Sequence, residues 1–111
     1  TLTDLFTQTK HAHWNVKGPN FYQLHLLFDT LAEALEDPID DIAERAAQLG
    51  GVARGTARDV VRQSKVAEFP ADVFDGMKVV TALADRYAAA GNDLRRAIDD
   101  ADKLGDKDTA D

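Results

Sequence analysis

The first residues of the chain carry apolar side chains at steps of three and four, the pattern of one face of an amphipathic helix. The residues on this face are Leu2, Leu5, Phe6, Thr9, His13 and Val16. Gly18, Pro19 and Asn20 follow, a combination typical of a helix end and a turn. The pattern therefore predicts one helix before residue 18 and a second element after residue 20.

A second and longer helix is expected from about residue 20 to residue 49, because apolar side chains again recur on one helical face. This stripe consists of Leu24, Phe28, Leu31, Leu35, Ile42, Ala46 and Leu49. Gly50 and Gly51 supply the stop. Pro38 lies inside the segment, where it cannot donate a hydrogen bond to the Ala34 carbonyl, so we expect a kink there.

Between residues 52 and 69 the periodicity weakens, and only a short amphipathic helix around residues 56 to 63 is expected. Pro70 and Asp72 then predict the start of a third long helix, which ends at Gly105. Its apolar residues keep the spacing of a left-handed bundle seam. The seam consists of Val73, Met77, Val80, Ala84, Tyr87, Gly91, Leu94, Ile98 and Ala101. The last residues, "GDKDTAD", resemble the N-terminus of a further helix.

These elements predict an all-α fold, an up-down-up-down four-helix bundle whose fourth helix is missing from this chain. We expect one domain over residues 1–111, incomplete at both ends, since Thr1 already lies in an apolar-periodic segment. A length of 111 residues with 44% hydrophobic content suits a single small core. No apolar run approaches the ~20 residues of a membrane span and no secretory leader is recognisable, so a cytoplasmic location is expected.

Composition narrows the chemistry that the chain could carry. It has no cysteine, which leaves His, Asp and Glu as metal ligands. The formal net charge of -7 argues against a nucleic-acid-binding core and suits a protein that attracts cations. A basic tail outside this chain would still allow DNA binding.

Two pairs of potential metal ligands lie on one face of the second expected helix. His25 and Asp29 are four residues apart. Asp40 and Glu44 repeat that spacing, and all four positions fall within an arc of about 100°. The centres of the pairs are fifteen residues apart, roughly 22 Å along a helix, whereas a metal–ligand bond is ~2 Å long. Two copies packed antiparallel about a two-fold axis near residues 34 and 35 would join the pairs, with His13 as a further ligand.

Other interpretations of these residues stay open at this point. A single histidine on a helix is more often hydrogen-bonded or solvated than a ligand, and "DPIDDIAER" is also typical of a charged outer face. Periodicity does not select a unique ligand set, because Glu33 and Glu36 share the same arc. Trp14 is expected in core or interface packing, and His11 is expected to be exposed.

The remaining charged residues have simpler interpretations. A basic series is expected to form a solvated face or ion pairs between subunits, with a phosphate-binding stripe as the rarer alternative. It consists of Arg54, Arg58, Arg62 and Lys65. Three aspartates near the end are expected to cap a helix, face solvent, or pass cations at a symmetry axis. They are Asp106, Asp108 and Asp111.

Three stretches resemble a known family. "KHAHWNVKGPNFYQLHLLFD" and "DDIAERAAQLGG" are similar to signatures of the Dps family (DNA-binding protein from starved cells), the mini-ferritins. "LADRYAAAGNDLRRAI" is similar to the family's third helix, so the resemblance spans essentially the whole chain. It implies a ferritin-like four-helix bundle that assembles into a hollow dodecamer. It further implies oxidation of Fe(II) with hydrogen peroxide or O2, storage of ferric mineral, and protection of DNA from oxidative damage.

Carried over residue by residue, the resemblance implies a di-iron ferroxidase centre at a dimer interface. The implied ligands are His13, His25 and Asp29 of one subunit and Asp40 and Glu44 of its two-fold mate. The turn at residues 18–19 would fold His13 toward His25. The sequence has no Glu-x-x-His motif, so the centre found inside the bundle of larger ferritins is not available.

Two alternatives of other classes are kept beside the ferroxidase. One is a DNA-compacting structural particle with little ferroxidase activity, associated with the nucleoid and binding DNA through tails missing from this chain. The other is a zinc-binding helical bundle. No alternative involves a membrane partner.

Overall fold

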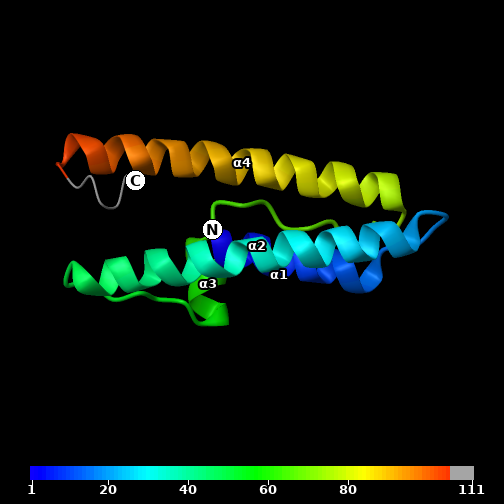
Figure 1. Ribbon diagram of the computed structural model, residues 1–111, viewed down its shortest axis with the longest axis horizontal. Coiled ribbons are helices and arrows are strands. Elements are labelled where there is room, and N and C mark those ends of the chain that lie inside the picture. The colour runs from blue at the N-terminus through cyan, green and yellow to red at the C-terminus, as the bar shows by residue number, and fades with distance from the viewer. Residues whose placement is uncertain (106–111) are drawn as a thin grey trace.

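The computed structural model describes residues 1–105 and contains four helices in that range (Figure 1). They are α1 (Leu2–Asn15), α2 (Phe21–Gln48), α3 (Ala57–Gln63) and α4 (Gly76–Lys103). The described residues form no strand, and one isolated bridge joins Lys17 and Asp75. The predictions for Asp106, Asp108 and Asp111, and for a helix start there, lie outside the described residues. No helix between residues 1 and 105 is long and apolar enough to cross a membrane.

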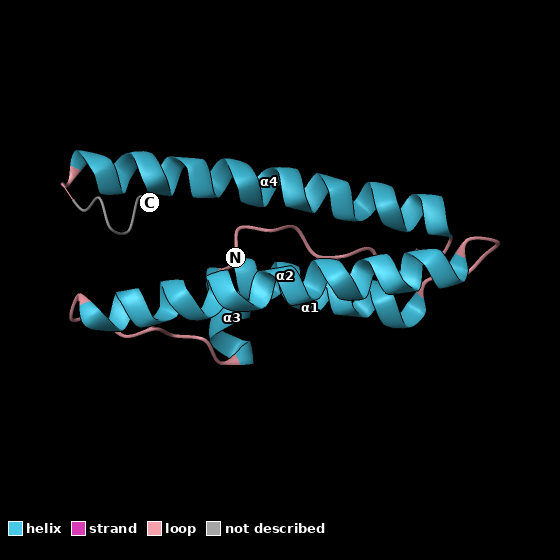
Figure 2. Cartoon of the chain, viewed as in Figure 1, coloured by secondary structure: helices cyan, strands magenta, loops and turns pink. Residues whose placement is uncertain are grey.

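Helices α1 and α2 form an antiparallel pair, and α4 lies along them (Figure 1). α2 continues through Pro38 as one helix to Gln48. The short α3 lies at the side, between two long loops that lead from α2 to α4 (Figure 2). The all-α bundle class expected from the sequence is confirmed.

The long helices do not alternate in direction along the chain, as the predicted up-down-up-down arrangement requires. α4 begins at the same end of the molecule as α2, so these two helices run parallel (Figure 1). The Lys17–Asp75 bridge fixes this, because Lys17 precedes α2 and Asp75 is the N-cap of α4. The chain between residues 49 and 75 therefore crosses back along the bundle, which its length permits at ~3.3 Å per extended residue.

α4 also begins later than predicted from Pro70 and Asp72. Its first residue is Gly76, because the backbone just before it is held in extended form by the turn between α1 and α2. Lys17 donates its backbone N–H to the Phe74 carbonyl at 2.8 Å and accepts one from Gly76 at 3.2 Å. A Cβ on Gly76 would lie only 2.7 Å from Leu24 Cδ1, so glycine allows this close approach.

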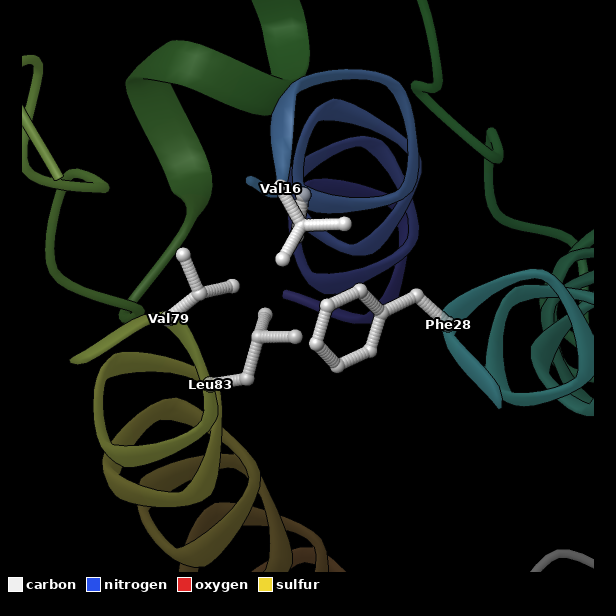
Figure 3. Packing of buried hydrophobic residues seen from close by; sticks show 5 residues of the cluster. Val16, Phe28, Val79 and Leu83 are labelled. Carbon is white, nitrogen blue, oxygen red and sulfur yellow. The ribbon is translucent and has the colours of Figure 1, made fainter. Parts of the chain in front are cut away.

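The main hydrophobic core forms where three helices meet. Figure 3 shows Val16 from the end of α1, Phe28 from α2, and Val79 and Leu83 from α4 pointing toward one another. Each of these four side chains is at most 3% exposed. A second cluster near the other end joins Leu5, Val66 and Ala90. The first cluster lies next to the α1–α2 turn, so the packing of the core sets the position of that turn.

Gly18 in this turn has a positive φ of 113°, which side-chain-bearing residues adopt only with strain. We expect Gly18→Ala to lower the free energy of unfolding by about 1–2 kcal/mol. A Cβ there would meet nothing closer than 3.8 Å, so the loss would come from the backbone alone. Denaturant unfolding at fixed protein concentration measures it.

The matched control is Gly55→Ala in the loop before α3. Gly55 lacks a positive φ and its added Cβ would have no atom within 4 Å. The free energy of unfolding of the Gly55→Ala variant should equal that of the wild type or exceed it by up to about 1 kcal/mol. Equal losses in both variants would contradict the role given to the Gly18 conformation.

Candidate metal centre

His13 and His25 face each other across the α1–α2 turn. Their rings stack with centroids 3.8 Å apart and an angle of 16° between the planes. His13 Nδ1 lies 2.5 Å from the His25 carbonyl oxygen, and His25 Nδ1 lies 2.8 Å from the His13 carbonyl oxygen. A carbonyl oxygen can only accept, so both Nδ1 atoms donate a proton. In the neutral rings Nε2 then carries a free lone pair, the form in which histidine binds metals.

The reciprocal hydrogen bonds also give a partner to a backbone carbonyl at the end of α1. His13 lies in the last turn of α1, where carbonyl groups lack partners within the helix. The next candidate donor, the Lys17 N–H, bonds to Phe74 instead. The His25 ring therefore satisfies the His13 carbonyl, and the helix end holds the ring in place.

Asp29 lies one turn after His25 on α2 and completes this group. Its Oδ1 is 3.9 Å from His13 Nε2 and 2.7 Å from Lys10 Nζ. The hydrogen bond from Lys10 holds the pKa of the Asp29 carboxyl below its ordinary value, although partial burial acts in the opposite direction. The structure thus brings His13, His25 and Asp29 together, as predicted, with a carboxylate that is ionised at neutral pH.

Lys10 was not among the residues expected at this site. Its ammonium group donates a hydrogen bond to Asp29 Oδ1, an oxygen that a bound metal ion would need as a ligand. A signal was available in the sequence, because Lys10 precedes His13 by three residues and therefore lies on the same side of α1. A lysine at that spacing is usually assigned to solvent.

Of the rings around His13 and His25, His11 differs from expectation, whereas the interface packing expected for Trp14 stays a prediction. Phe21 stacks on His25, with ring centroids 5.2 Å apart. Trp14 is 66% exposed, so it is not part of this chain's core. His11 was expected to be exposed but is half-buried, with its ring edge against Phe69 at 5.4 Å, because the loop before α4 covers that side of α1.

Asp40 and Glu44 form a second, exposed group on the other half of α2. Together with Asp41 they place one carboxylate oxygen each within 4.8 Å of one another. The negative charge of Asp40 raises the pKa of Glu44 above its ordinary value. Sequence reasoning missed Asp41, although the "DPIDD" stretch puts it next to Asp40. The repulsion within the group is the kind that a bound cation relieves.

The two groups do not meet within the chain. α2 is one helix from Phe21 to Gln48, so their centres, fifteen residues apart, are roughly 22 Å apart. Imidazole nitrogen and carboxylate oxygen are a donor set that suits Fe(II) and also Zn(II). Each group alone offers too few ligands for a closed site. Glu33 and Glu36, in the same arc, belong to neither ligand group.

Comparison with known proteins places the chain in a family. The Ferritin-like domain family model matches residues 2–111. The DNA protection during starvation protein of Agrobacterium fabrum is 43% identical over 111 residues, which is 100% of this chain and 68% of that protein. The comparison thus covers the whole chain and about two thirds of its relative.

Solved structures agree with the sequence comparison. Dps from Staphylococcus aureus superposes with a TM-score of 0.90 at 32% identity, over 98% of this chain and 72% of that chain. The Dps protein from Vibrio cholerae O1, described as a member of a broad superfamily of ferritin-like diiron-carboxylate proteins, gives 0.90 at 25% identity, over 98% and 68%. On the family match, the sequence identity and the shared fold, the chain belongs to the Dps family of ferritin-like proteins.

Proposed function

We propose that the chain is the metal-handling part of a Dps-type ferroxidase, which takes Fe(II) as its substrate and deposits ferric mineral inside a hollow oligomer. The observation that carries this proposal is the pair of Nε2 atoms left free by the reciprocal bonds of His13 and His25. With Asp29 beside them they form half of a metal site. Removing Fe(II) and peroxide from solution in this way protects DNA from oxidative damage.

The other half of the site comes from a second subunit. A two-fold axis near residues 34 and 35 of α2 places Asp40 and Glu44 of the partner subunit against His25 and Asp29. Each dimer then has two equivalent sites. The exposed side chains of Tyr22 and Leu26 on α2 would be buried by such packing, which favours association.

Each half of the site contributes a distinct property. The histidines supply neutral nitrogen donors, and the acidic residues supply negative charge that attracts Fe(II). The partner's Asp40 and Glu44 repel each other until a cation binds between them. In the proposed reaction two Fe(II) ions each lose one electron. Hydrogen peroxide takes both electrons and two protons and becomes two water molecules, so no hydroxyl radical is released; O2 is the alternative oxidant.

A DNA-compacting particle is less well supported by the described residues. Two members of the basic series are already paired within the chain: Arg62 with Asp59, and Lys65 with Asp93 at 3.2 Å. The net charge of -7 repels phosphate groups. A zinc-binding bundle would use the same ligands, and fast peroxide consumption with Fe(II) separates it from a ferroxidase.

The shared site predicts complementation between inactive subunits. Homo-oligomers of His25→Ala or of Glu44→Ala should lose most peroxide-driven Fe(II) oxidation, because every site lacks one ligand. In a mixed dimer one site carries both defects and the other carries none. With random pairing and independent sites, co-refolding the variants should restore about a quarter of the wild-type initial rate. Mass spectrometry confirms mixed dimers, and absorbance of ferric product gives the rate.

Glu33→Ala serves as the matched control, since Glu33 is an exposed acidic residue on the same arc of α2 but outside the ligand groups. It should keep a near wild-type rate. A site built within one chain predicts no recovery on mixing. Confirmed mixed dimers that stay as inactive as their parents would therefore rule out the shared site.

Lys10 competes with the metal ion for Asp29, so Lys10→Met should tighten Co(II) binding by up to about five-fold, the upper end of the range expected for a partly exposed ion pair. The pKa of Asp29 should rise toward its ordinary value near 3.9, still leaving it ionised at pH 7. As pH falls, the variant should therefore lose its Asp29 charge at a higher pH than the wild type. Co(II) absorption at pH 7 measures the affinity, and the carboxyl ¹³C chemical shift of Asp29 across a pH series without metal measures its pKa.

Lys17→Met is the matched control for charge. Lys17 is exposed and lies over the Phe74 ring at 5.3 Å, away from Asp29. The Lys17→Met substitution removes one positive charge, as Lys10→Met does, but leaves the Lys10–Asp29 ion pair in place. An equal gain in Co(II) affinity in both variants would mean that net charge, not competition at Asp29, limits binding.

A further inference from the structure

The backbone carbonyl of His13 has two possible hydrogen-bond donors. In a continuing α-helix the N–H of Lys17, four residues later, would bond to it. Val16 still makes such a bond, to Ala12 at 2.9 Å, but its ψ of 139° then turns the chain out of the helix. The His13 carbonyl accepts from His25 Nδ1 at 2.8 Å instead. Whatever keeps the Lys17 N–H away therefore keeps this carbonyl available to the His25 ring.

The segment just before and at the start of α4 holds Lys17 in place. Lys17 donates its backbone N–H to the Phe74 carbonyl at 2.8 Å, and its own carbonyl accepts from the Gly76 N–H at 3.2 Å. The Lys17 ammonium group also lies over the Phe74 ring, 5.3 Å from its centroid. Both backbone groups of Lys17 are thus paired with a segment that is distant in the sequence, and α1 cannot continue through this residue.

This pairing needs a glycine at position 76. Gly76 is buried, and a Cβ there would lie 2.7 Å from Leu24 Cδ1. Leu24 packs against the main hydrophobic core and directly precedes His25. A side chain at position 76 would therefore push the start of α4 away from Lys17 or displace Leu24, and either movement reaches the His25 ring.

We propose that residues 74–76, which lie beside the α1–α2 turn where α4 begins (Figure 1), are a positioning element for the candidate metal site. They hold the Lys17 N–H away from the His13 carbonyl, and that carbonyl then fixes the His25 ring with Nε2 free for a metal ion. The segment contributes no ligand and acts only through Lys17 and His13. The inference deepens the proposed function, on which its importance for Fe(II) rests.

The proposal makes docking of residues 74–76 and metal binding depend on each other. The docked segment favours the metal-binding orientation of His25, so a bound metal ion should favour docking by the same factor. One hydrogen bond is at stake, which corresponds to a factor of about two to ten in an equilibrium constant.

Substitution of Gly76 tests the element in the full-length protein. Gly76→Val should weaken Co(II) binding by about two- to ten-fold, measured by Co(II) absorption. Leu24→Ala makes room for the new side chain, so Gly76→Val combined with Leu24→Ala should bind within about two-fold of Leu24→Ala alone. The matched control is Gly55→Val, because a Cβ on Gly55 would have no atom within 4 Å, and it should bind like the wild type.

The His25 ring itself gives a readout that a general loss of stability does not change. The chain has three histidines, so ¹⁵N labelling of histidine and solid-state NMR of the metal-free protein can show which ring nitrogen carries the proton. His25 should carry it on Nδ1 in the wild type and on both nitrogens, in a mixture, in Gly76→Val. Val66→Ala, in the second hydrophobic cluster, should lower stability and leave the His25 proton on Nδ1. An unchanged His25 signal in folded Gly76→Val would overturn the proposal.

The wild-type protein supplies a test that does not depend on how the variants fold. Saturating Zn(II) should slow hydrogen exchange of the Lys17 and Gly76 N–H groups by about two- to ten-fold, the factor expected from the mutual dependence. The Val60 N–H, bonded to the Thr56 carbonyl at 2.9 Å within α3, is the control and should exchange at an unchanged rate. No slowing at Lys17 and Gly76, or equal slowing at all three groups, would overturn the proposal.

These readouts separate the positioning element from the proposed function, because none of them requires iron oxidation. Recovery of activity by mixing His25→Ala with Glu44→Ala, together with an unchanged His25 ring in Gly76→Val, would overturn the positioning element and leave the shared site standing. The expected NMR and exchange results in a protein that does not oxidise Fe(II) would support the positioning element and contradict the ferroxidase.

Discussion

Two hydrogen bonds between histidine rings and backbone carbonyls, exchanged across the α1–α2 turn, hold together the part of the chain on which the proposed function depends. They fix the end of α1 against the start of α2, satisfy a carbonyl that the helix leaves without a partner, and place the proton of each neutral ring on Nδ1. The same bonds leave Nε2 of each ring free for a metal ion. Structural and chemical roles therefore coincide in one pair of residues, and a substitution at either position removes both.

The two halves of α2 differ in how their carboxylates are compensated. Its first half carries a carboxylate that is already neutralised by Lys10, whereas its second half carries carboxylates that repel one another. Neither half is a complete site, and each supplies what the other lacks: nitrogen donors on one side, uncompensated negative charge on the other. In the proposed dimer, association of two chains about an axis in the middle of α2 would combine them without any change in the helix itself.

The positions of α1 and α2 and the candidate ligands could be predicted from the sequence. The predictions that were wrong failed for physical reasons. The 3.6-residue period located α1 and α2 closely, and the spacing of His25, Asp29, Asp40 and Glu44 already placed the two pairs too far apart to meet within one chain. Local signals could not give the start of α4, because the backbone pairing of Lys17 with Phe74 and Gly76 joins residues far apart in sequence. The parallel course of α2 and α4 was missed for the same reason. Lys10 and the half-burial of His11 depend on contacts between elements, which periodicity does not describe.

The connection between α2 and α4 has a consequence for the order of folding. The α1–α2 pair is built from contacts between neighbours in sequence, so it can form early and quickly, whereas α4 must wait for a crossing segment of some 26 residues to close on Lys17. His13, His25 and Asp29 all lie in the early-forming hairpin. Half of the metal site would then exist before the hydrophobic core is complete, and an emerging chain could hold an ion while its bundle is still open.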